Sequence, residues 1–105
     1  MFGLGGVFVE LYRDVSFGLA PLSKEDACWM IKDIKGHRLL EGYRGSAPVD
    51  KEALTEILIK TSEIMATGLV EELDLNPVTL YAQGAMVLDA KMKLRKASFD
   101  SSFRG

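Results

Sequence analysis

The sequence contains a single cysteine, Cys28, so no internal disulfide can form. That scarcity fits a reducing compartment, and we expect a cytoplasmic protein. No apolar run approaches the ~20 residues of a membrane-spanning helix, which argues against a membrane partner. Residues 1–12 are apolar but have neither a basic region nor a small-residue cleavage site, so we do not interpret them as a signal peptide.

An excess of basic charge is also missing. Thirteen basic and 15 acidic residues give a net charge of -2, and no basic stripe is visible. The densest basic run is Lys91, Lys93, Arg95 and Lys96, a pattern typical of one solvated strand face. We therefore expect no nucleic-acid partner.

The length of 105 residues and the hydrophobic content of 48% predict one domain with one core. A chain of this size buries about two-thirds of the surface that its unfolded form exposes. Little room remains for a deep substrate pocket together with a nucleotide site. Most enzymes that hold two substrates and a nucleotide need a longer chain than this.

Two β-rich runs, residues 7–12 and 15–20, flank the polar pair Arg13–Asp14 and predict a β-hairpin. Apolar residues occur at both parities, which predicts a sheet covered on both faces. The glycine-rich stretch 3–6 then precedes a strand. A phosphate-binding glycine loop follows a strand and opens a helix, so this stretch is not interpreted as a nucleotide fingerprint.

A first helix is predicted to start at Ser23, with Asp26 completing an approximate capping box, and to stop at Gly36. Its apolar stripe repeats at helical spacing over Ala27, Met30, Ile31 and Ile34. Trp29 falls off this stripe, and an exposed tryptophan is a sign of a partner surface.

A second helix is predicted from a cap at Asp50 to a close at Gly68, after a loop with a short strand at 37–48. Its buried stripe comprises Leu54, Ile57, Leu58, Thr61, Ile64 and Met65.

The end of the chain predicts a second β-hairpin. Residues 69–77 alternate strictly between apolar and polar, and a turn at Gln83–Gly84 leads into the strand that ends near residue 93. The order of elements predicts an α+β fold, an antiparallel sheet of four or more strands with two helices packed on it. Residues 94–105 form a polar tail.

Polar side chains gather on one face of this second hairpin. With Ala82 opposite Ala85, Asn76 and Asp89 become diagonal neighbours, about 7–8 Å apart or somewhat less. A carboxylate and a carboxamide at that spacing can share a magnesium ion. Lys91 on the same face could meet a phosphate, and Asp74 lies one step further along. The alternative is the solvated polar face of an ordinary sheet, and spacing alone leaves both open.

The stretch ELDLNPVTLYAQGAMVLDAKM at 72–92 resembles the closing hairpin of ATP-grasp synthetases of the succinyl-CoA and ADP-forming acetyl-CoA type. FGLGGVFVELYRDVSF, LAPLSKEDA and LLEGYRG, at 2–17, 19–27 and 39–45, resemble successive segments of the same domain. The resemblance implies that Asn76 and Asp89 hold magnesium. It also implies that Asp74 and Lys91 contact the nucleotide phosphates.

The resemblance further implies an incomplete domain, residues 1–93 being the C-terminal ATP-grasp lobe. The complete enzyme, an acid–CoA ligase, would convert acyl-CoA, ADP and phosphate to acid, CoA and ATP. Its partners would be Mg²⁺ with ATP or ADP and a CoA-binding subunit or domain, and the chain could form homo-oligomers. We expect the isolated chain to be inactive.

The family usually carries an arginine where this chain has Gly18. That departure favours an alternative function, a non-catalytic binding or assembly module that retains the lobe fold.

Overall fold

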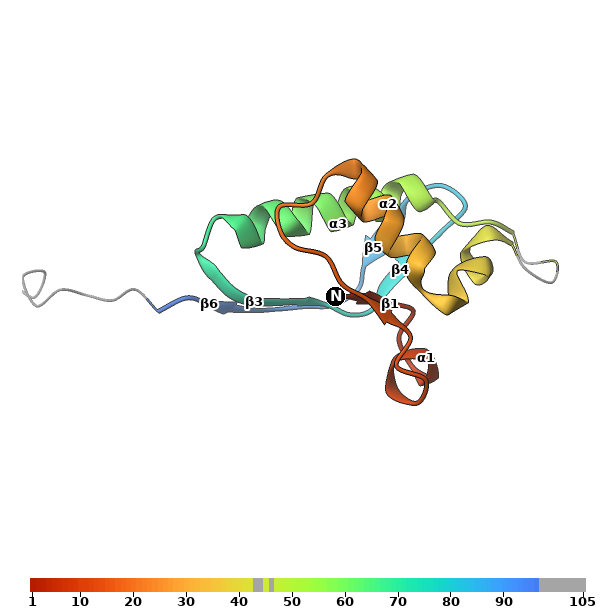
Figure 1. Ribbon diagram of the computed structural model, residues 1–105, viewed down its shortest axis with the longest axis horizontal. Helices are drawn as coiled ribbons and strands as arrows, with labels where there is room; N and C mark the ends of the chain where they lie inside the picture. Colours follow the sequence, from red (N-terminus) through yellow and green to blue (C-terminus); the bar gives the residue numbers. More distant parts are fainter. Residues whose placement is uncertain (43–44, 46, 97–105) are drawn as a thin grey trace, which may run out of the picture.

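The computed structural model describes residues 1–42, 45 and 47–96 (Figure 1). In chain order the elements are β1 (Phe2–Gly3), α1 (Val7–Glu10), β2 (Val15–Ser16), α2 (Lys24–Asp33), the 3₁₀ helix η1 (Lys35–Glu41), α3 (Lys51–Ala66), β3 (Val70–Leu75), β4 (Val78–Leu80), β5 (Ala85–Val87) and β6 (Ala90–Leu94). The mixed α+β class is confirmed. None of the described helices is both long and apolar enough to cross a membrane.

The strands pair as three separate two-stranded ladders, β1–β2, β3–β6 and β4–β5, all antiparallel. A single sheet of four or more strands is therefore wrong for the described residues. Proline has no backbone N–H, so Pro77 interrupts the long hairpin between β3 and β4. The strands stay connected there, because the Leu88 N–H donates to the Pro77 carbonyl at 3.0 Å. Figure 1 shows β3 and β6 side by side along α3.

Helix α2 starts as predicted. The Ser23 hydroxyl accepts from the Asp26 N–H, and the Asp26 carboxylate accepts from the Ser23 N–H, both at 3.0 Å. These bonds hold the pKa of Asp26 below its ordinary value. The predicted stripe is confirmed, since all four of its members are buried: Ala27, Met30, Ile31 and Ile34.

The predicted stop of α2 at Gly36 is wrong, because the helix ends at Asp33 and η1 follows at once. A buried carboxylate explains the early end. Asp14 accepts from the N–H groups of Lys35 and Gly36 at 2.6 and 2.8 Å, which satisfies the free donors at the start of η1. The short strand predicted within 37–48 is replaced by η1, and residues 43, 44 and 46 lie outside the described residues.

Helix α3 has the predicted cap. Asp50 accepts from the Ala53 N–H at 3.0 Å, and Gly68 follows the helix with a positive φ of 76°. Its predicted stripe holds only in part. Leu54 is buried, whereas Ile64 is 41% exposed. The last turns of α3 extend beyond α2 (Figure 1), and of their two stripe residues Ile64 is exposed and Met65 is half-buried.

The predicted hairpin of 7–12 and 15–20 is wrong. Val7–Glu10 forms the four-residue helix α1, and β2 pairs with β1, with Phe2 opposite Ser16. A hairpin that is apolar on both faces needs cover on both, and an isolated two-stranded hairpin is marginal in water. In the described chain α2 packs against β2, and α1 lies against β1, with Val9 Cγ2 2.9 Å from the position that a Cβ atom on Gly3 would take.

The core is small. Ile31, Leu40 and Leu54 form its centre, with Phe2, Leu4, Val49, Leu58 and Leu80 packed around them. Many large apolar side chains remain exposed on the helices and strands, including Trp29 at 57%, as predicted. All five residues of β6 are exposed. The described residues therefore leave much apolar side-chain surface exposed to solvent.

Candidate functional site

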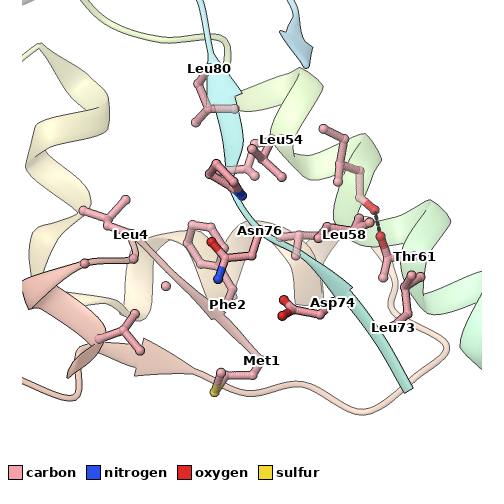
Figure 2. A pocket seen from close by; sticks show the side chains of 18 of the residues that line it. Met1, Phe2, Leu4, Leu54, Leu58, Thr61, Leu73, Asp74, Asn76 and Leu80 are labelled. Carbon is pink, nitrogen blue, oxygen red and sulfur yellow. Dashed lines mark hydrogen bonds between the residues drawn. The ribbon is translucent and has the colours of Figure 1, made fainter. Parts of the chain in front are cut away.

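A groove of about 420 Å³ runs between the N-terminal segment, α3 and β3 (Figure 2). Residues 1–6 form one wall, the α3 side chains from Leu54 to Thr61 form the second, and residues 73–78 form the third. Its volume lies within the range of about 300–1,000 Å³ that is common for ligand pockets. Its walls combine polar and apolar surface, and Asp74 and Asn76 are among the polar side chains that line it.

Strand β3 and the residue that follows it place two of the predicted site residues, Asp74 and Asn76, at this groove. Successive side chains of a strand point to opposite faces, so Asp74 and Asn76 share one face and Leu73 belongs to the other. Figure 2 shows Asp74 and Asn76 extending to the same side, toward Phe2 and Met1, while Leu73 extends toward Thr61 of α3. The structure thus places Asp74 and Asn76 together on one wall.

The other two predicted residues, Asp89 and Lys91, lie across the ribbon. Lys91 is opposite Asp74 in the β3–β6 register, and the Asn76 N–H donates to the Asp89 carbonyl at 3.1 Å. Both Asp89 and Lys91 are exposed, and neither lines the groove. The hairpin therefore brings the backbones of all four positions together: Asp74 and Lys91 lie in β3 and β6, and Asn76 and Asp89 lie directly beside these strands.

The predicted register is wrong by two residues. The Tyr81 N–H donates to the Gly84 carbonyl at 3.0 Å and Leu80 pairs with Ala85, so the turn is Ala82–Gln83. Asn76 and Asp89 are consequently opposite rather than diagonal. A one-residue slip exchanges the faces of a strand, whereas a two-residue slip preserves them. The error therefore changes the spacing of the pair and not the face.

Asp50 fixes this hairpin to α3. One carboxylate oxygen accepts from the Ala53 N–H that it caps, and the other accepts from the Gly84 N–H at 2.8 Å. The Asp50 N–H also donates to the Tyr81 carbonyl at 2.7 Å. The Gly84 bond, and then the Ala53 bond, hold the pKa of Asp50 below its ordinary value. Sequence reasoning found the cap and missed the tether, which no local pattern indicates.

The oxygen atoms available here fit a hard cation. Within the described part of the chain, no side-chain hydrogen bond engages Asp74, Asn76 or Asp89. No three His, Cys, Asp or Glu side chains of residues 1–42, 45 and 47–96 gather as a metal cage. Magnesium needs no such cage, because it takes one or two carboxylates together with substrate phosphates and water. The donor set therefore suits magnesium better than a fully protein-bound metal.

The glycine-rich stretch 3–6 also lines the groove, and the prediction about its context is wrong. It begins at Gly3, the last residue of β1, and ends directly before α1, so it does connect a strand to a helix. Gly5 and Gly6 have positive φ values of 78° and 54°, which favour glycine at both positions. Glu10 of α1 borders the same groove. Because residues 7–12 were predicted to form a strand, no helix was expected after the glycines.

Gly18 lies in a tight place. A Cβ atom there would lie 2.6 Å from Met30 Sδ and 2.8 Å from Leu22 Cδ2. Met30 is buried, at 2% exposure. Met30 and Leu22 thus occupy the space through which a side chain at position 18 would leave the backbone, so an arginine would need both to move.

Comparison with known proteins gives a consistent result. Residues 1–94 match the family model of the ATP-grasp domain. The chain is 47% identical over 95 residues to the beta subunit of acetate–CoA ligase (ADP-forming) I of Pyrococcus furiosus, covering 90% of this chain and 41% of that protein. It is 49% identical over 92 residues to acetate–CoA ligase (ADP-forming) II of Archaeoglobus fulgidus, covering 88% of this chain and 14% of that one.

Solved structures agree. The dinucleotide-forming acetyl-coenzyme A synthetase 1 of Ca. Korarchaeum cryptofilum, solved with coenzyme A and Mg-AMPPCP, superposes with a TM-score of 0.82. It is 53% identical, with coverage of 89% of this chain and 44% of that chain. The apo form gives a TM-score of 0.84. The chain thus spans less than half the length of each of these relatives.

Proposed function

The chain belongs to the ATP-grasp domain family and is homologous to ADP-forming acetyl-CoA synthetases, and on that premise we propose that its side chains contact the magnesium ion and the nucleotide phosphates in such a synthetase. One observation carries the proposal: the hairpin brings Asp74, Asn76, Asp89 and Lys91 together beside a groove. The Korarchaeum relative was solved with Mg-AMPPCP, a magnesium nucleotide analogue. The match in sequence and fold supports the same ligand class here.

Asn76 and Asp89 are the proposed magnesium ligands. Both offer side-chain oxygen atoms, and only Asp89 brings a full negative charge. At the nucleotide phosphates, Lys91 is proposed to donate to phosphate oxygens, and Asp74, opposite Lys91 in the register, to orient the Lys91 ammonium. When bound, magnesium would neutralise phosphate charge during phosphoryl transfer. The residues of this chain would position the nucleotide.

In the complete enzyme the reaction would be acyl-CoA + ADP + phosphate ⇌ acid + CoA + ATP. The proposed unit is the second ATP-grasp lobe over residues 1–93, with 94–105 as a tail. Phosphoryl transfer depends on positioning and charge neutralisation by groups from both sides of the nucleotide. An isolated lobe should therefore bind ATP or ADP weakly and turn over no substrate. A CoA-binding subunit or domain would be its partner.

A chimeric enzyme tests this function. Residues 1–94 would replace the matching segment of the Pyrococcus furiosus beta subunit, assayed together with the rest of that synthetase. We expect turnover, and Asp89→Asn should remove most of it while Asp33→Asn, an exposed carboxylate on α2, should not. A folded chimera with no turnover, or with equal activity in both variants, would contradict the proposal.

One observation favours the second candidate, a non-catalytic assembly module. Met30 and Leu22 close over Gly18, where the family usually carries an arginine. If that arginine is required for turnover, the chimera should gain activity when Gly18→Arg is combined with Met30→Ala, which makes room for it. An inactive chimera that stays inactive with this pair of changes, while folding and assembling normally, would favour the assembly module.

A further inference from the structure

Asp50 holds the closed end of the long hairpin at the start of α3. Its carboxylate accepts from the Gly84 N–H at 2.8 Å and from the Ala53 N–H at 3.0 Å. Its own N–H donates to the Tyr81 carbonyl at 2.7 Å. The two carboxylate oxygens therefore have different roles, since one caps the helix and the other holds the hairpin.

The open end of the hairpin is attached at the other end of the same helix. The Arg95 side chain donates to the Gly68 carbonyl, and the Arg95 N–H donates to the Leu69 carbonyl, both at 2.9 Å. Helix α3 has 16 residues, so it spans about 24 Å between the two attachments. Figure 1 shows β3 and β6 running back along α3, with β4 and β5 near its start. The helix therefore supports the hairpin at both ends.

The proposed magnesium ligands lie between these attachments, at the junction of two ladders. Asn76 follows the β3 strand of the β3–β6 ladder, and Asp89 precedes its β6 strand. The Asn76 N–H donates to the Asp89 carbonyl at 3.1 Å, and the Leu88 N–H donates to the Pro77 carbonyl at 3.0 Å. Pro77 has no N–H to add to this pairing. The relative position of Asn76 and Asp89 therefore depends on how the ladders on both sides are held.

Magnesium binding is sensitive to that position. The ion takes near-octahedral coordination at about 2.0–2.1 Å from its ligands. A functional site has to be held within about 0.5 Å of its productive geometry. Leu80 of β4 packs against the core, but apolar contact has no preferred direction. The hydrogen bonds from Asp50 to Gly84 and Tyr81 are directional, so they fix where the β4–β5 end lies against α3.

We infer that Asp50 is a positioning residue of the magnesium site, whose bond to the Gly84 N–H sets the geometry of Asn76 and Asp89. Asp50 does not line the groove, so it acts through the hairpin and not by contact with the nucleotide. The inference rests on the proposed function, because it concerns the same metal site. It goes beyond a contribution to stability, because the effect on the metal should remain when the helix cap is kept.

Asp50→Ser separates the two roles of the carboxylate. Serine is as good an N-cap residue as aspartate, so the cap of α3 is kept. Its single oxygen, on a shorter side chain, cannot also accept from the Gly84 N–H. Amide hydrogen exchange of the 105-residue chain, followed by NMR, measures the junction directly. We expect the Asn76 and Leu88 amides to exchange at least about fivefold faster in Asp50→Ser, and the Ala27 amide in α2 to be unchanged.

Ser23→Ala is the matched control, because it removes the cap of α2 and leaves the hairpin untouched. It should speed exchange of the Ala27 amide and leave the Asn76 and Leu88 amides unchanged. If Asp50→Ser does not fold, Asp50→Asn replaces it. Its carboxamide keeps one acceptor oxygen and turns an NH₂ group toward the second donor, so the same junction amides should exchange faster.

The chimeric synthetase provides the functional measurement. Asp50→Ser should raise the half-maximal Mg²⁺ concentration at least about threefold, and should add no further increase to a chimera that already carries Asp89→Asn, as expected of coupled residues. Ser23→Ala should leave the Mg²⁺ requirement unchanged.

Faster exchange of all three amides by the same factor in Asp50→Ser would show a general loss of stability and overturn the inference. Unchanged exchange at Asn76 and Leu88, or an unchanged Mg²⁺ requirement in Asp50→Ser while Asp89→Asn raises it, would overturn it as well. An unchanged Mg²⁺ requirement in Asp89→Asn would instead contradict the proposed function. Hydrogen exchange would then still decide whether Asp50 holds the junction.

Discussion

The buried carboxylate of Asp14 should be one of the most important single side chains for the stability of this chain. It is 6% exposed, and its two oxygens accept from the N–H groups of Lys35 and Gly36 at 2.6 and 2.8 Å. These bonds join the turn before β2 to the junction of α2 and η1, 21 and 22 residues away along the chain. Loss of the carboxylate should therefore loosen both elements.

A hydrogen bond to a charged group contributes about 1.5–3 kcal/mol, and an orphaned buried donor costs about 1–3 kcal/mol. Asp14→Asn keeps one acceptor oxygen and loses the other, so we expect about 2 kcal/mol of lost stability. Asp14→Ala loses both acceptors and should cost about 4 kcal/mol. A domain of this size is typically stable by only about 5–15 kcal/mol. The alanine variant should thus be close to unfolding.

Urea unfolding followed by the fluorescence of Trp29, the single tryptophan, provides the assay. Asp33→Asn, on the exposed last residue of α2, is the control and should change stability by less than about 0.5 kcal/mol. A change within that limit for Asp14→Asn, or an equal loss of stability in the two Asp14 variants, would contradict this role of Asp14.

Three further outcomes follow from the same structure. Gly18→Ala should cost about 1–3 kcal/mol by overpacking against Met30, and combining it with Met30→Ala should cost less than the sum of the single changes in the same urea assay. Asp50 has a pKa below its ordinary value of 3.8, so its stabilising effect should be complete above that pH and lost as pH falls through the lower, folded-state value. Thermal midpoints measured across acid pH should therefore fall less steeply in Asp50→Asn than in the wild type. Calorimetric titration of the isolated chain with ATP and Mg²⁺ should show a dissociation constant well above 1 µM, so that binding is weaker than about -8 kcal/mol. A micromolar value would mean that the site is more complete than proposed.

The helices were predictable because their signals are local. Ser23 and Asp26 mark the start of α2, and Asp50 marks the start of α3, through hydrogen bonds between residues only three apart. Apolar spacing identified the buried face of α2 in the same way. The end of α2 was not predictable, because Asp14 determines it from another part of the chain.

The strands were harder to predict, since strand pairing depends on the elements that pack against the sheet. Residues 7–12 have strand composition, yet Val7–Glu10 is helical and its Val9 lies against Gly3 of β1. The register of the long hairpin was missed by two residues because the turn lacks an Asn-Gly signal, and the tether from Asp50 to Gly84 is not visible in sequence. The prediction that Asp74 and Asn76 share one face was correct, because the alternation of side chains along a strand does not depend on the turn.

The central claim, that Asn76 and Asp89 contact magnesium while Lys91 contacts phosphate, is tested most directly by magnesium titration of the chimeric synthetase. Turnover would be measured against Mg²⁺ concentration at saturating nucleotide for the unchanged chimera, Asp89→Asn and Lys91→Gln. We expect Asp89→Asn to raise the half-maximal Mg²⁺ concentration at least about tenfold, a loss of about 1.4 kcal/mol in metal binding. Lys91→Gln should instead raise the KM for nucleotide and leave the Mg²⁺ requirement unchanged. An unaltered Mg²⁺ requirement in a folded, active Asp89→Asn chimera would contradict it.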